Sequence, residues 1–449
     1  MFIEPVKNIL DPWDVFLAVS DRQYPFILEN QTNAAKTARF SLVGFDPCII
    51  IKAWQNNIEI THDSVKETKT GDPFSVLNSI LAAHKQSFDE KLPCGGAVGY
   101  FGYDLKNLLE NLPQKAPQKP FIPDLLFGIY DTMFVYDHNE CKSYIASAVM
   151  SKLKEFKNII QKNKTQTSAK ALVFGQFASN FTKNEYLSAI KKAKSYISSG
   201  DIYQINLSQK FKIPFEGDPK AFYSKLRRIH PVPFGAFLDC GGFQVISNSP
   251  ECFLKIQNGT IETYPIKGTS PRGKNPAEDA MLIKELKTDA KELAEHIMIV
   301  DLERNDIGKV CKTGTVKVKE FEKIVTYPTL HHMVSCVTGE IKKGISSIDC
   351  IKACFPGGSI TGAPKIRAME IIDELEPTPR GIYTGAIGYI DFSGNVNLGM
   401  AIRTAVVSNN EMQLSVGGGI VADSVPEDEY EETLLKAEAF FRAMKRNRQ

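Results

Sequence analysis

The stretch Asp201-Ile202-Tyr203-Gln204-Ile205-Asn206-Leu207-Ser208 follows a helix-like segment, Thr182 to Ser198, that ends at Gly200. Apolar and polar residues alternate along it as in a half-buried β-strand, which places Gln204 and Asn206 on one face with Ile202 and Ser208. Two amides on one face indicate either a polar cavity or an exposed edge, and the pattern alone leaves both interpretations open. A helix followed by such a strand predicts a chain of mixed α and β structure.

The composition is that of an ordinary globular protein. The 449 residues are 43% hydrophobic and 24% charged, which excludes a disordered or fibrous chain. With 54 basic and 52 acidic residues the net charge is +2, and no polybasic stripe is interleaved with aromatic residues. We therefore expect neither nucleic acid nor an anionic membrane as a partner.

The N-terminus and the cysteines predict a cytoplasmic chain without disulfides. Met1-Phe2-Ile3-Glu4-Pro5 lacks the features of a signal peptide, and no stretch approaches the roughly 18 apolar residues of a membrane span. Nine scattered cysteines without a Cys-x-x-Cys pair indicate neither a disulfide framework nor a zinc site. Cys350 and Cys354, one helical turn apart, are expected to be buried as small apolar residues.

One chain boundary is predicted, near residue 175. The first third alternates short β-type runs, at 41–45 and 48–51, with helical stretches such as 74–85. The lysine-rich segment 151–170 contains Thr165-Gln166-Thr167-Ser168, which is typical of an exposed connection. We therefore divide the chain into a scaffold region, 1–175, and a region 176–449 that carries most of the polar motifs.

Lys267 lies in the run Tyr264-Pro265-Ile266-Lys267-Gly268-Thr269. A lysine among apolar and glycine neighbours can be held neutral and become a nucleophile. The alternative is a surface lysine with its ammonium group in solvent.

Two acidic clusters have helical spacing. In the first, Leu293, Ile297 and Val300 form an apolar stripe, while Glu292 and Glu295 lie on another face. Such a pair of carboxylates usually belongs to a solvated face, and this interpretation remains open for each cluster taken alone.

The second cluster places Glu429, Glu432 and Lys436 on one side of a helix. Four carboxylates from two helices could hold a Mg²⁺ ion that keeps several waters and receives an anionic substrate as a further ligand. A lysine beside them would help to fix the anion.

Two glycine-rich runs could bind that anion. Gly417-Gly418-Gly419 follows the strand-like run 413–416, so that backbone N–H groups are open to a ligand. The second run, 355–365, contains Gly362 and enters a helix at about Lys365. Tight turns without a ligand are the alternative for both.

Together these motifs closely resemble the chorismate-utilising enzymes, the family of anthranilate, aminodeoxychorismate, isochorismate and salicylate synthases. The resemblance runs along almost the whole chain. Its most specific pieces are Gly200 to Phe211, Ser249-Pro250-Glu251, Tyr264 to Arg272, Glu292 to Asp306, Phe355 to Glu370, Gly399 to Thr404, and Gly417 to Lys436. It implies an α+β fold like that of anthranilate synthase component I: two large, mostly antiparallel sheets packed face to face, with outer helices and a central chorismate cleft. Region 176–449 would then be the chorismate-binding catalytic region.

Within the family, the chain is most similar to the aminodeoxychorismate branch. The run Pro-Ile-Lys-Gly-Thr resembles component I of aminodeoxychorismate synthase, whereas anthranilate synthases carry alanine in place of Lys267. The segments Tyr203 to Asn206 and Pro231 to Phe237 agree with that branch. Gln204 stands where isochorismate and salicylate synthases carry a lysine base, so the resemblance implies that water is not the final nucleophile.

The resemblance also implies roles for the acidic residues. Chorismate carries two carboxylates and a ring hydroxyl that leaves poorly unless it is protonated. Glu295 and Glu432 would bind Mg²⁺ directly, with Glu292 and Glu429 acting through its waters. Glu251 would donate the proton, for which it needs a raised pKa.

Lys267 would attack the ring, and ammonia would resolve the covalent adduct to 4-amino-4-deoxychorismate, a precursor of 4-aminobenzoate and folate. His332 would lie close to the ring, unless it is only a core residue. The other residues implied at the substrate are Arg403 and Tyr383 at the enolpyruvyl carboxylate, the backbone of Gly418 and Gly419, and Thr269, Ser359, Gly362 and Lys436.

Two departures from the family pattern bear on partners and regulation. Many relatives have a Leu-Glu-Ser run at which tryptophan binds, and this chain has Leu28-Glu29-Asn30 instead. The resemblance therefore does not imply a bound tryptophan here. No glutaminase segment follows the last motif, so we expect ammonia from a separate glutaminase subunit or from solution. Anthranilate synthase component I and a non-catalytic ligand-binding subunit remain the alternatives.

Overall fold

The structure is a computed structural model that describes residues 2–7, 10–32, 37–85, 92–113, 122–162, 171–326 and 330–445, without the side chains of Thr269 and Leu330. The predicted connection at Thr165 to Ser168 lies outside the described residues.

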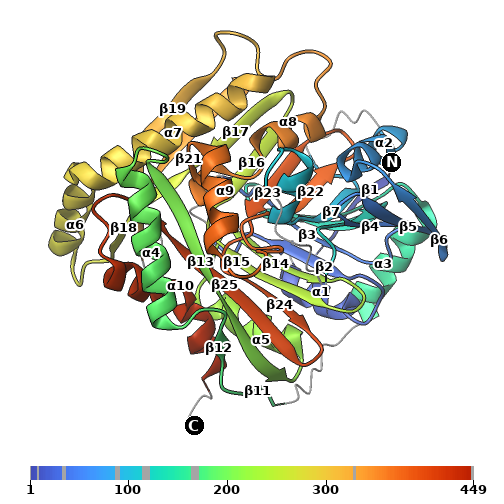
Figure 1. Ribbon diagram of the computed structural model, residues 1–449. Helices are drawn as coiled ribbons and strands as arrows, with labels where there is room; N and C mark the ends of the chain where they lie inside the picture. Colours follow the sequence, from blue (N-terminus) through green and yellow to red (C-terminus); the bar gives the residue numbers. More distant parts are fainter. Residues whose placement is uncertain are drawn as a thin grey trace.

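Two large antiparallel sheets form the molecule (Figure 1). Within the described residues, one sheet has 13 strands and the other has 12. The first sheet has the order β1 (Phe2–Pro5), β10 (Lys142–Ser147), β9 (Thr132–Asp137), β3 (Phe40–Gly44), β2 (Phe26–Glu29), β14 (Phe234–Asp239), β15 (Gln244–Ser249), β24 (Thr404–Ser408), β25 (Glu411–Ile420), β13 (Gln204–Glu216) and β11 (Val173–Phe174), with β12 (Ala178–Ser179) and β21 (Gly362–Ala363) also on β13. The second has the order β18 (Ile266–Pro271), β20 (Leu330–Glu340), β17 (Thr260–Tyr264), β16 (Cys252–Gln257), β23 (Val396–Met400), β22 (Ala386–Asp391), β7 (Gly96–Phe101), β8 (Leu125–Tyr130), β4 (Ile49–Trp54), β5 (Asn57–His62) and β6 (Val65–Thr70), with β19 (Lys317–Thr326) on β20.

The sheets pack face to face through a shared apolar layer. Phe26 and Leu238 from the first sheet belong to the same buried cluster as Tyr100 and Tyr130 from the second. The rings of Phe26 and Tyr130 meet edge to face, with centroids 4.6 Å apart. The predicted α+β fold of two packed antiparallel sheets is therefore confirmed.

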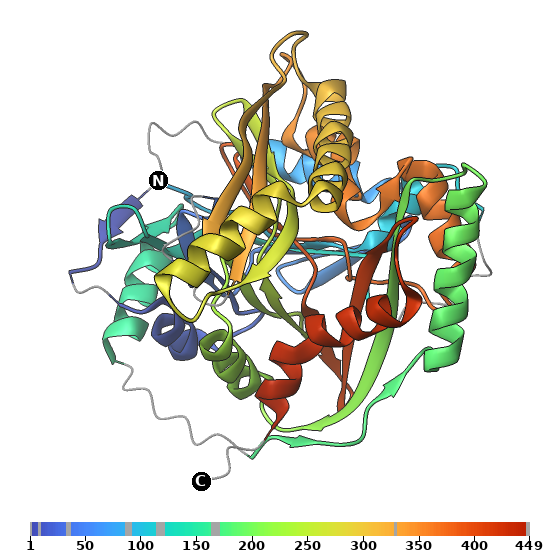
Figure 2. The same ribbon diagram turned by 90° about the vertical axis from the view of Figure 1, so that its left-hand side faces the viewer.

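Helices cover the outer faces of both sheets (Figures 1 and 2). Those packed on the first sheet are α1 (Pro12–Val19), α3 (Met150–Lys162), α5 (Pro219–Ile229) and α10 (Pro426–Met444). Those packed on the second are α2 (Pro73–Ala83), α7 (Ala290–Val310) and α8 (Ser347–Cys354). The remaining elements are α4 (Lys183–Ser198) and α9 (Lys365–Leu375) beside β13, α6 (Pro276–Thr288) beside β18, and the 3₁₀ turns η1 (Tyr103–Leu108) and η2 (Gly358–Ile360).

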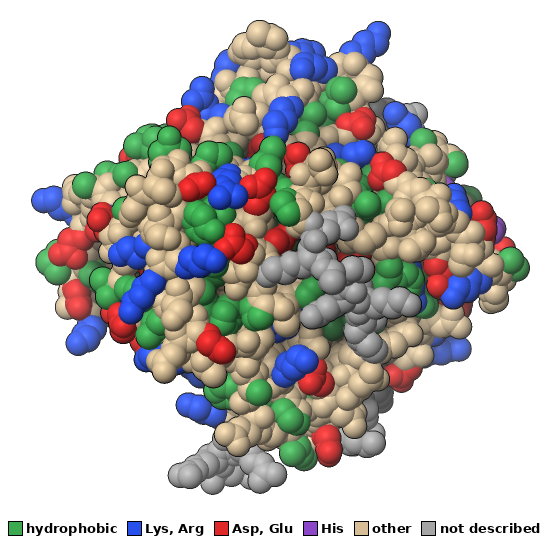
Figure 3. Space-filling view, in the orientation of Figure 1, with side chains coloured by type: hydrophobic (Ala, Val, Ile, Leu, Met, Phe, Trp, Pro, Cys, Tyr) green, Lys and Arg blue, Asp and Glu red, His purple; other side chains and the backbone are tan. Residues whose placement is uncertain are grey.

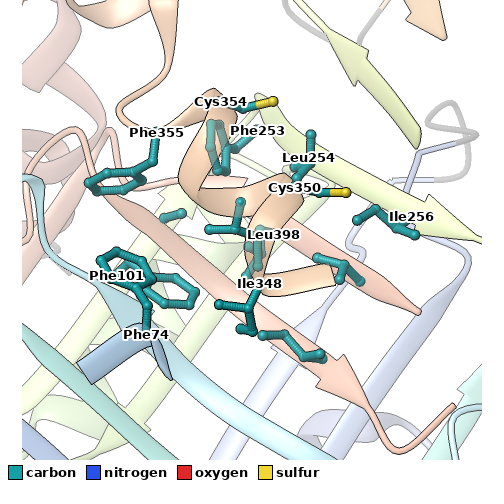
Figure 4. Close-up of a cluster of buried hydrophobic side chains, with 14 of the residues drawn as sticks. Phe74, Phe101, Phe253, Leu254, Ile256, Ile348, Cys350, Cys354, Phe355 and Leu398 are labelled. Carbon is teal, nitrogen blue, oxygen red and sulfur yellow. The ribbon is translucent and has the colours of Figure 1, made fainter. Parts of the chain in front are cut away.

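Figure 4 shows the core between α2, α8 and the second sheet. Phe74 of α2 stacks on Phe101 of β7, with ring centroids 5.4 Å apart. Cys350 and Cys354 of α8 point into the same cluster and are both free and buried. They are the buried apolar residues that the sequence predicted.

Both sheets contain strands from both sides of residue 175. In the first sheet β2 pairs with β14, and in the second β7 pairs with β22. The division at residue 175 is therefore one between chain regions that share two sheets, and it stays a prediction about where function lies.

The surface carries mixed charge. On the face shown in Figure 3, lysine and arginine side chains are interspersed with aspartate and glutamate. In the ranges that the structure describes, each helix is too short or too polar for a membrane span.

Candidate active site

Lys267 is placed by a bulge in β18. Lys267 lies opposite Met333 of β20 and Thr269 opposite His332, so the register shifts at the intervening Gly268. Gly268 has φ +68°, and a Cβ there would come within 2.9 Å of the Leu286 side chain. Glycine thus allows the bulge that sets the direction of Lys267.

The surroundings of Lys267 favour its neutral form. The side chain is partly exposed, yet burial among protein groups lowers its pKa. Glu295 acts in the opposite direction, and Lys436 lowers the pKa further. Lys267 is therefore not the freely solvated lysine of the alternative interpretation.

The glycines of β25 border the Lys267 amine. β25 continues through the glycine run and pairs with β13, so that Asn206 lies opposite Gly419 and Leu207 opposite Gly418. A Cβ at Gly419 would clash with Gln204 Nε2 and would lie 3.7 Å from Lys267 Nζ. Three segments that are far apart in the sequence thus meet at one point.

The alternation in β13 was predicted correctly, but the strand is not half-exposed. Gln204 and Asn206 are only 2% and 9% exposed, and Ile205 and Leu207 on the opposite face are fully buried. The buried Gln204 Oε1 has no hydrogen-bond partner among the described residues. Of the two interpretations of this strand, the structure therefore favours a polar cavity.

The second acidic cluster lies against the same glycines. A Cβ at Gly418 would lie 3.3 Å from Glu429 Oε2, 3.8 Å from Glu432 Oε1 and 3.9 Å from Lys436 Nζ. Lys436 Nζ is 2.6 Å from Glu432 Oε1 and donates a 3.0 Å hydrogen bond to the Gly417 carbonyl. Burial and the neighbouring Glu432 raise the pKa of Glu429; at Glu432 burial acts in the same direction, but Lys436 outweighs it and lowers the pKa.

The first acidic cluster faces Lys267 from α7. Burial, and next the charge of Glu295, raise the pKa of Glu292, while Lys267 lowers it. Lys267 also lowers the pKa of Glu432. The Lys267 ammonium thus lies in the field of both carboxylate pairs.

The predicted apolar stripe of α7 is wrong at Ile297, which is 46% exposed. The buried face instead contains His296 and Ile299. His296 Nε2 lies 2.6 Å from Ser335 Oγ, so a histidine of α7 packs on β20. On the same helix, Glu292 and Glu295 lie near enough to Lys267 for their charges to raise its pKa.

The carboxylates fit Mg²⁺ in their chemistry. Oxygen donors suit this hard cation. Burial first, and then repulsion within each pair, raises the pKa values of Glu292 and Glu429, and a divalent cation would relieve that repulsion. Among the described residues, however, no three His, Cys, Asp or Glu side chains gather closely enough to hold a metal ion. The two pairs stand apart on their helices, and the metal site stays a prediction.

Glu251 connects β15 to β16 and is 6% exposed. Ser359 Oγ donates a 2.6 Å hydrogen bond to its Oε1. Burial raises the pKa of Glu251 against the effects of Ser359, Lys267 and Arg403. A carboxyl group with a raised pKa is suited to donate a proton.

Arg403 and two histidines form another side of the site. Arg403 Nη1 lies 3.5 Å from His230 Nε2, and the Arg403 charge also acts on Glu251. Burial, then Arg403, lowers the pKa of His332 and of His230 to about 4. Both histidines are therefore neutral near pH 7, which leaves Arg403 as the cation of this group.

The remaining predicted residues are placed as follows. A Cβ at Gly417 would lie 2.7 Å from the Tyr383 hydroxyl, and burial raises the pKa of that hydroxyl to about 12. Gly362 has φ +136° and lies so close to β13 that a Cβ would clash with the Gln204 carbonyl. Thr269 lies in β18, and its side chain is outside the described part of the chain.

Three residues of this region were not predicted from the sequence: His230, Glu303 and Arg380. His230 and Arg380 lie outside the motifs that pointed to the site. Glu303 lies on the buried face of α7, together with Ile299 and Ile307. A sequence prediction with the correct buried face would have placed it there.

The family model of chorismate binding enzymes matches residues 24–442. The chain belongs to this family. The match spans both sheets, Lys267, Glu251 and both carboxylate pairs.

Relatives of this chorismate-binding enzyme include members of two branches at similar identity. Anthranilate synthase component 1 of Aquifex aeolicus is 38% identical, over 99% of this chain and 94% of its own. Aminodeoxychorismate synthase component 1 of Escherichia coli is 37% identical, over 97% of this chain and 94% of its own. The crystal structure of anthranilate synthase component I from Streptococcus pneumoniae superposes with a TM-score of 0.81 at 31% identity, covering 97% of this chain and 98% of that one. The chain is thus a chorismate-utilising enzyme, with both branches at similar identity.

Proposed function

We propose that this enzyme is component I of aminodeoxychorismate synthase, which converts chorismate and ammonia to 4-amino-4-deoxychorismate. The observation that carries the proposal is Lys267, an amine with a lowered pKa that lies within the fields of the Glu251 acid and of both carboxylate pairs. A neutral amine beside a protonated acid is the arrangement needed to displace a hydroxyl group.

The substrate is held by its two carboxylates. Arg403 offers a planar bidentate donor for the enolpyruvyl carboxylate, and Tyr383 a hydroxyl. Gly418 and Gly419 offer backbone without side chains in the way. Because successive N–H groups of a strand point to opposite sides, one of these two N–H groups points away from β13, toward a ligand. Thr269, Gly362, Lys436, His332 and Gln204 complete the pocket, and Ser359 orients the acid.

The displacement takes place between Glu251 and Lys267. Glu251 protonates the ring hydroxyl, whose C–O bond breaks as water leaves. Lys267 Nζ forms a C–N bond to the ring, and the resulting secondary ammonium returns a proton to the Glu251 carboxylate. Ammonia then forms its own C–N bond to the ring as the bond from the ring to Lys267 Nζ breaks. Glu251 gives its proton to the departing nitrogen, so that Lys267 leaves as a neutral amine, and the new ammonium group of the product returns a proton to Glu251.

Mg²⁺ is the proposed cofactor. Glu295 and Glu432 would hold it directly, and Glu292 and Glu429 through its waters. When bound, the ion supplies positive charge for the ring carboxylate.

Ammonia is proposed to come from a separate glutaminase subunit or from solution, in the cytoplasm. The relatives of both branches are named as component 1 of their synthases, which supports a second component.

Anthranilate synthase component I is the second candidate, supported by the 38% identity to the Aquifex relative. It would form anthranilate and pyruvate from the same substrates. A non-catalytic ligand-binding subunit is disfavoured because Glu251 and all four carboxylates are present in the sequence.

Product identification tests the proposal. The purified protein is incubated with chorismate, Mg²⁺ and ammonium at mildly alkaline pH, with and without an aminodeoxychorismate lyase, and the products are separated by mass spectrometry. Aminodeoxychorismate that becomes 4-aminobenzoate only with the lyase supports it. Anthranilate as the product supports the second candidate. Chorismate that stays unchanged even with a glutaminase subunit supports the non-catalytic ligand-binding subunit.

A further inference from the structure

Glu303 is a buried carboxyl group on α7 that the proposed reaction does not use. It lies about two helical turns beyond Glu295 and is 3% exposed. Its Oε1 accepts a 3.2 Å hydrogen bond from the N–H of Gly358, the first residue of η2. Burying a carboxyl group costs free energy unless the group is hydrogen-bonded. The hydrogen bond from the Gly358 N–H supplies such a partner for Glu303.

The next residue of η2 contacts the proposed acid. Ser359 Oγ donates to Glu251 Oε1, so Glu303 and Glu251 bind adjacent residues of one turn. At the third residue, the Ile360 carbonyl accepts a 3.2 Å hydrogen bond from Arg380.

Arg380 is anchored in turn. It is 4% exposed and pairs with Glu376 at 2.7 Å. The buried side chains of Glu303 and Arg380 therefore fix the two ends of this three-residue turn. The hydrogen bond to Glu251 lies between them. Such supporting contacts determine whether a group that touches the substrate stays in its productive position.

Glu303 lies in the field of several ionisable groups, Glu251 among them. Burial raises the pKa of Glu303 to about 7, and the charges of Asp306 and Glu251 act in the same direction. Lys365, which forms an ion pair with Asp306, opposes them, and the buried Cys354 thiol also faces this group. Because like charges disfavour one another's ionised form, an ionised Glu251 favours the protonated form of Glu303.

We propose that Glu303 is a positioning residue for Glu251: it holds the Gly358–Ile360 turn through the Gly358 N–H, so that Ser359 keeps its hydrogen bond to the acid. The inference rests on the proposed role of Glu251 and adds a residue outside the motif that carries that acid. It applies to the departure of the hydroxyl group, a step shared by both candidate reactions.

The test compares Glu303→Gln with Glu303→Met. Glutamine keeps an oxygen for the Gly358 N–H and removes the charge, whereas methionine removes both at similar volume. We expect Glu303→Met to lower kcat about threefold to tenfold, with KM for chorismate little changed. Glu303→Gln should restore most of kcat, because its side-chain oxygen can still accept from the Gly358 N–H. Asp301→Asn, on the exposed face of α7, is the matched control and should leave kcat and KM for chorismate unchanged.

A double-mutant cycle separates positioning from a general loss of structure. In a Ser359→Ala protein, adding Glu303→Met should lower kcat less than it does in the wild type, because both changes affect one contact. Losses that simply multiply, or a kcat of Glu303→Gln as low as that of Glu303→Met, would overturn the proposal. If Glu303→Met does not fold, Glu303→Ala, which also removes the oxygen, takes its place in both comparisons.

Chorismate consumption is the readout, so the result does not depend on which product forms. If the product proves to be anthranilate, the proposed function fails while the Glu303 test stands. If Glu251→Gln retains activity, the basis of the Glu303 proposal fails with it.

Discussion

The Ser359 hydroxyl donates a 2.6 Å hydrogen bond to the Glu251 carboxyl group. The two residues are 108 positions apart in the chain, and the contact joins η2 to the connection between β15 and β16. It orients a buried carboxyl whose raised pKa suits it to be the acid of a chorismate-utilising enzyme.

Glu251→Gln is predicted to lower kcat by roughly 100- to 10,000-fold, the usual contribution of a general acid. Glutamine keeps an oxygen for Ser359 Oγ, so the melting temperature should change little. In the wild type, kcat should fall as the pH rises through the raised pKa of Glu251, because the acid must be protonated. Steady-state kinetics and thermal unfolding check both statements, and wild-type turnover in the variant would show that another group is the acid.

Glu432→Gln is predicted to raise the Mg²⁺ concentration for half-maximal activity about 10- to 100-fold, the usual cost of weakening a metal site. Glu431→Gln on the same helix is the control, because Glu431 is exposed and pairs with Lys183 at 2.9 Å. Titration of activity with Mg²⁺ distinguishes them. Equal Mg²⁺ requirements in the two variants would remove Glu432 from the metal site.

His296 predicts how stability depends on pH. It is fully buried, and burial, followed by the charge of Lys267, lowers its pKa to about 4 from an unfolded value of 6.5. The unfolded chain therefore binds the proton first as pH falls, so the stabilisation is complete above pH 6.5 and is lost between 6.5 and 4.

Between pH 7 and pH 5, the wild type should lose about 2 kcal/mol more of its free energy of unfolding than His296→Gln. Chemical denaturation at the two pH values measures the difference. His230 and His332 titrate alike in both proteins and cancel in the comparison. Parallel losses in the two proteins would mean that His296 is charged or freely solvated in the native state.

Local structure was predictable from the sequence where a short segment determines it. The helix at Thr182 to Ser198 is confirmed: the Thr182 side chain accepts from the Glu185 N–H, and Gly200 beyond the end has φ +83°. Likewise, Glu432 and Lys436 pair at their predicted helical spacing.

Contacts between distant segments were not predictable in this way. The pairing of β2 with β14 joins residues about 200 positions apart, and no local pattern specifies it; the family resemblance supplied the fold. The buried phase of α7 was misjudged because Ile297 has an apolar side chain but points to solvent. That error hid Glu303, whose role depends on a turn from another part of the chain.

The mass of Lys267 during turnover tests the proposed covalent step most directly. The enzyme is mixed with chorismate and Mg²⁺ without ammonium, quenched, and digested, and the peptide that contains Lys267 is analysed. If Lys267 is the nucleophile, this peptide gains the mass of chorismate less one water, and the gain disappears when ammonium is added before the quench. An unmodified peptide, from an enzyme that still forms aminodeoxychorismate when ammonium is supplied, would contradict Lys267 as the nucleophile.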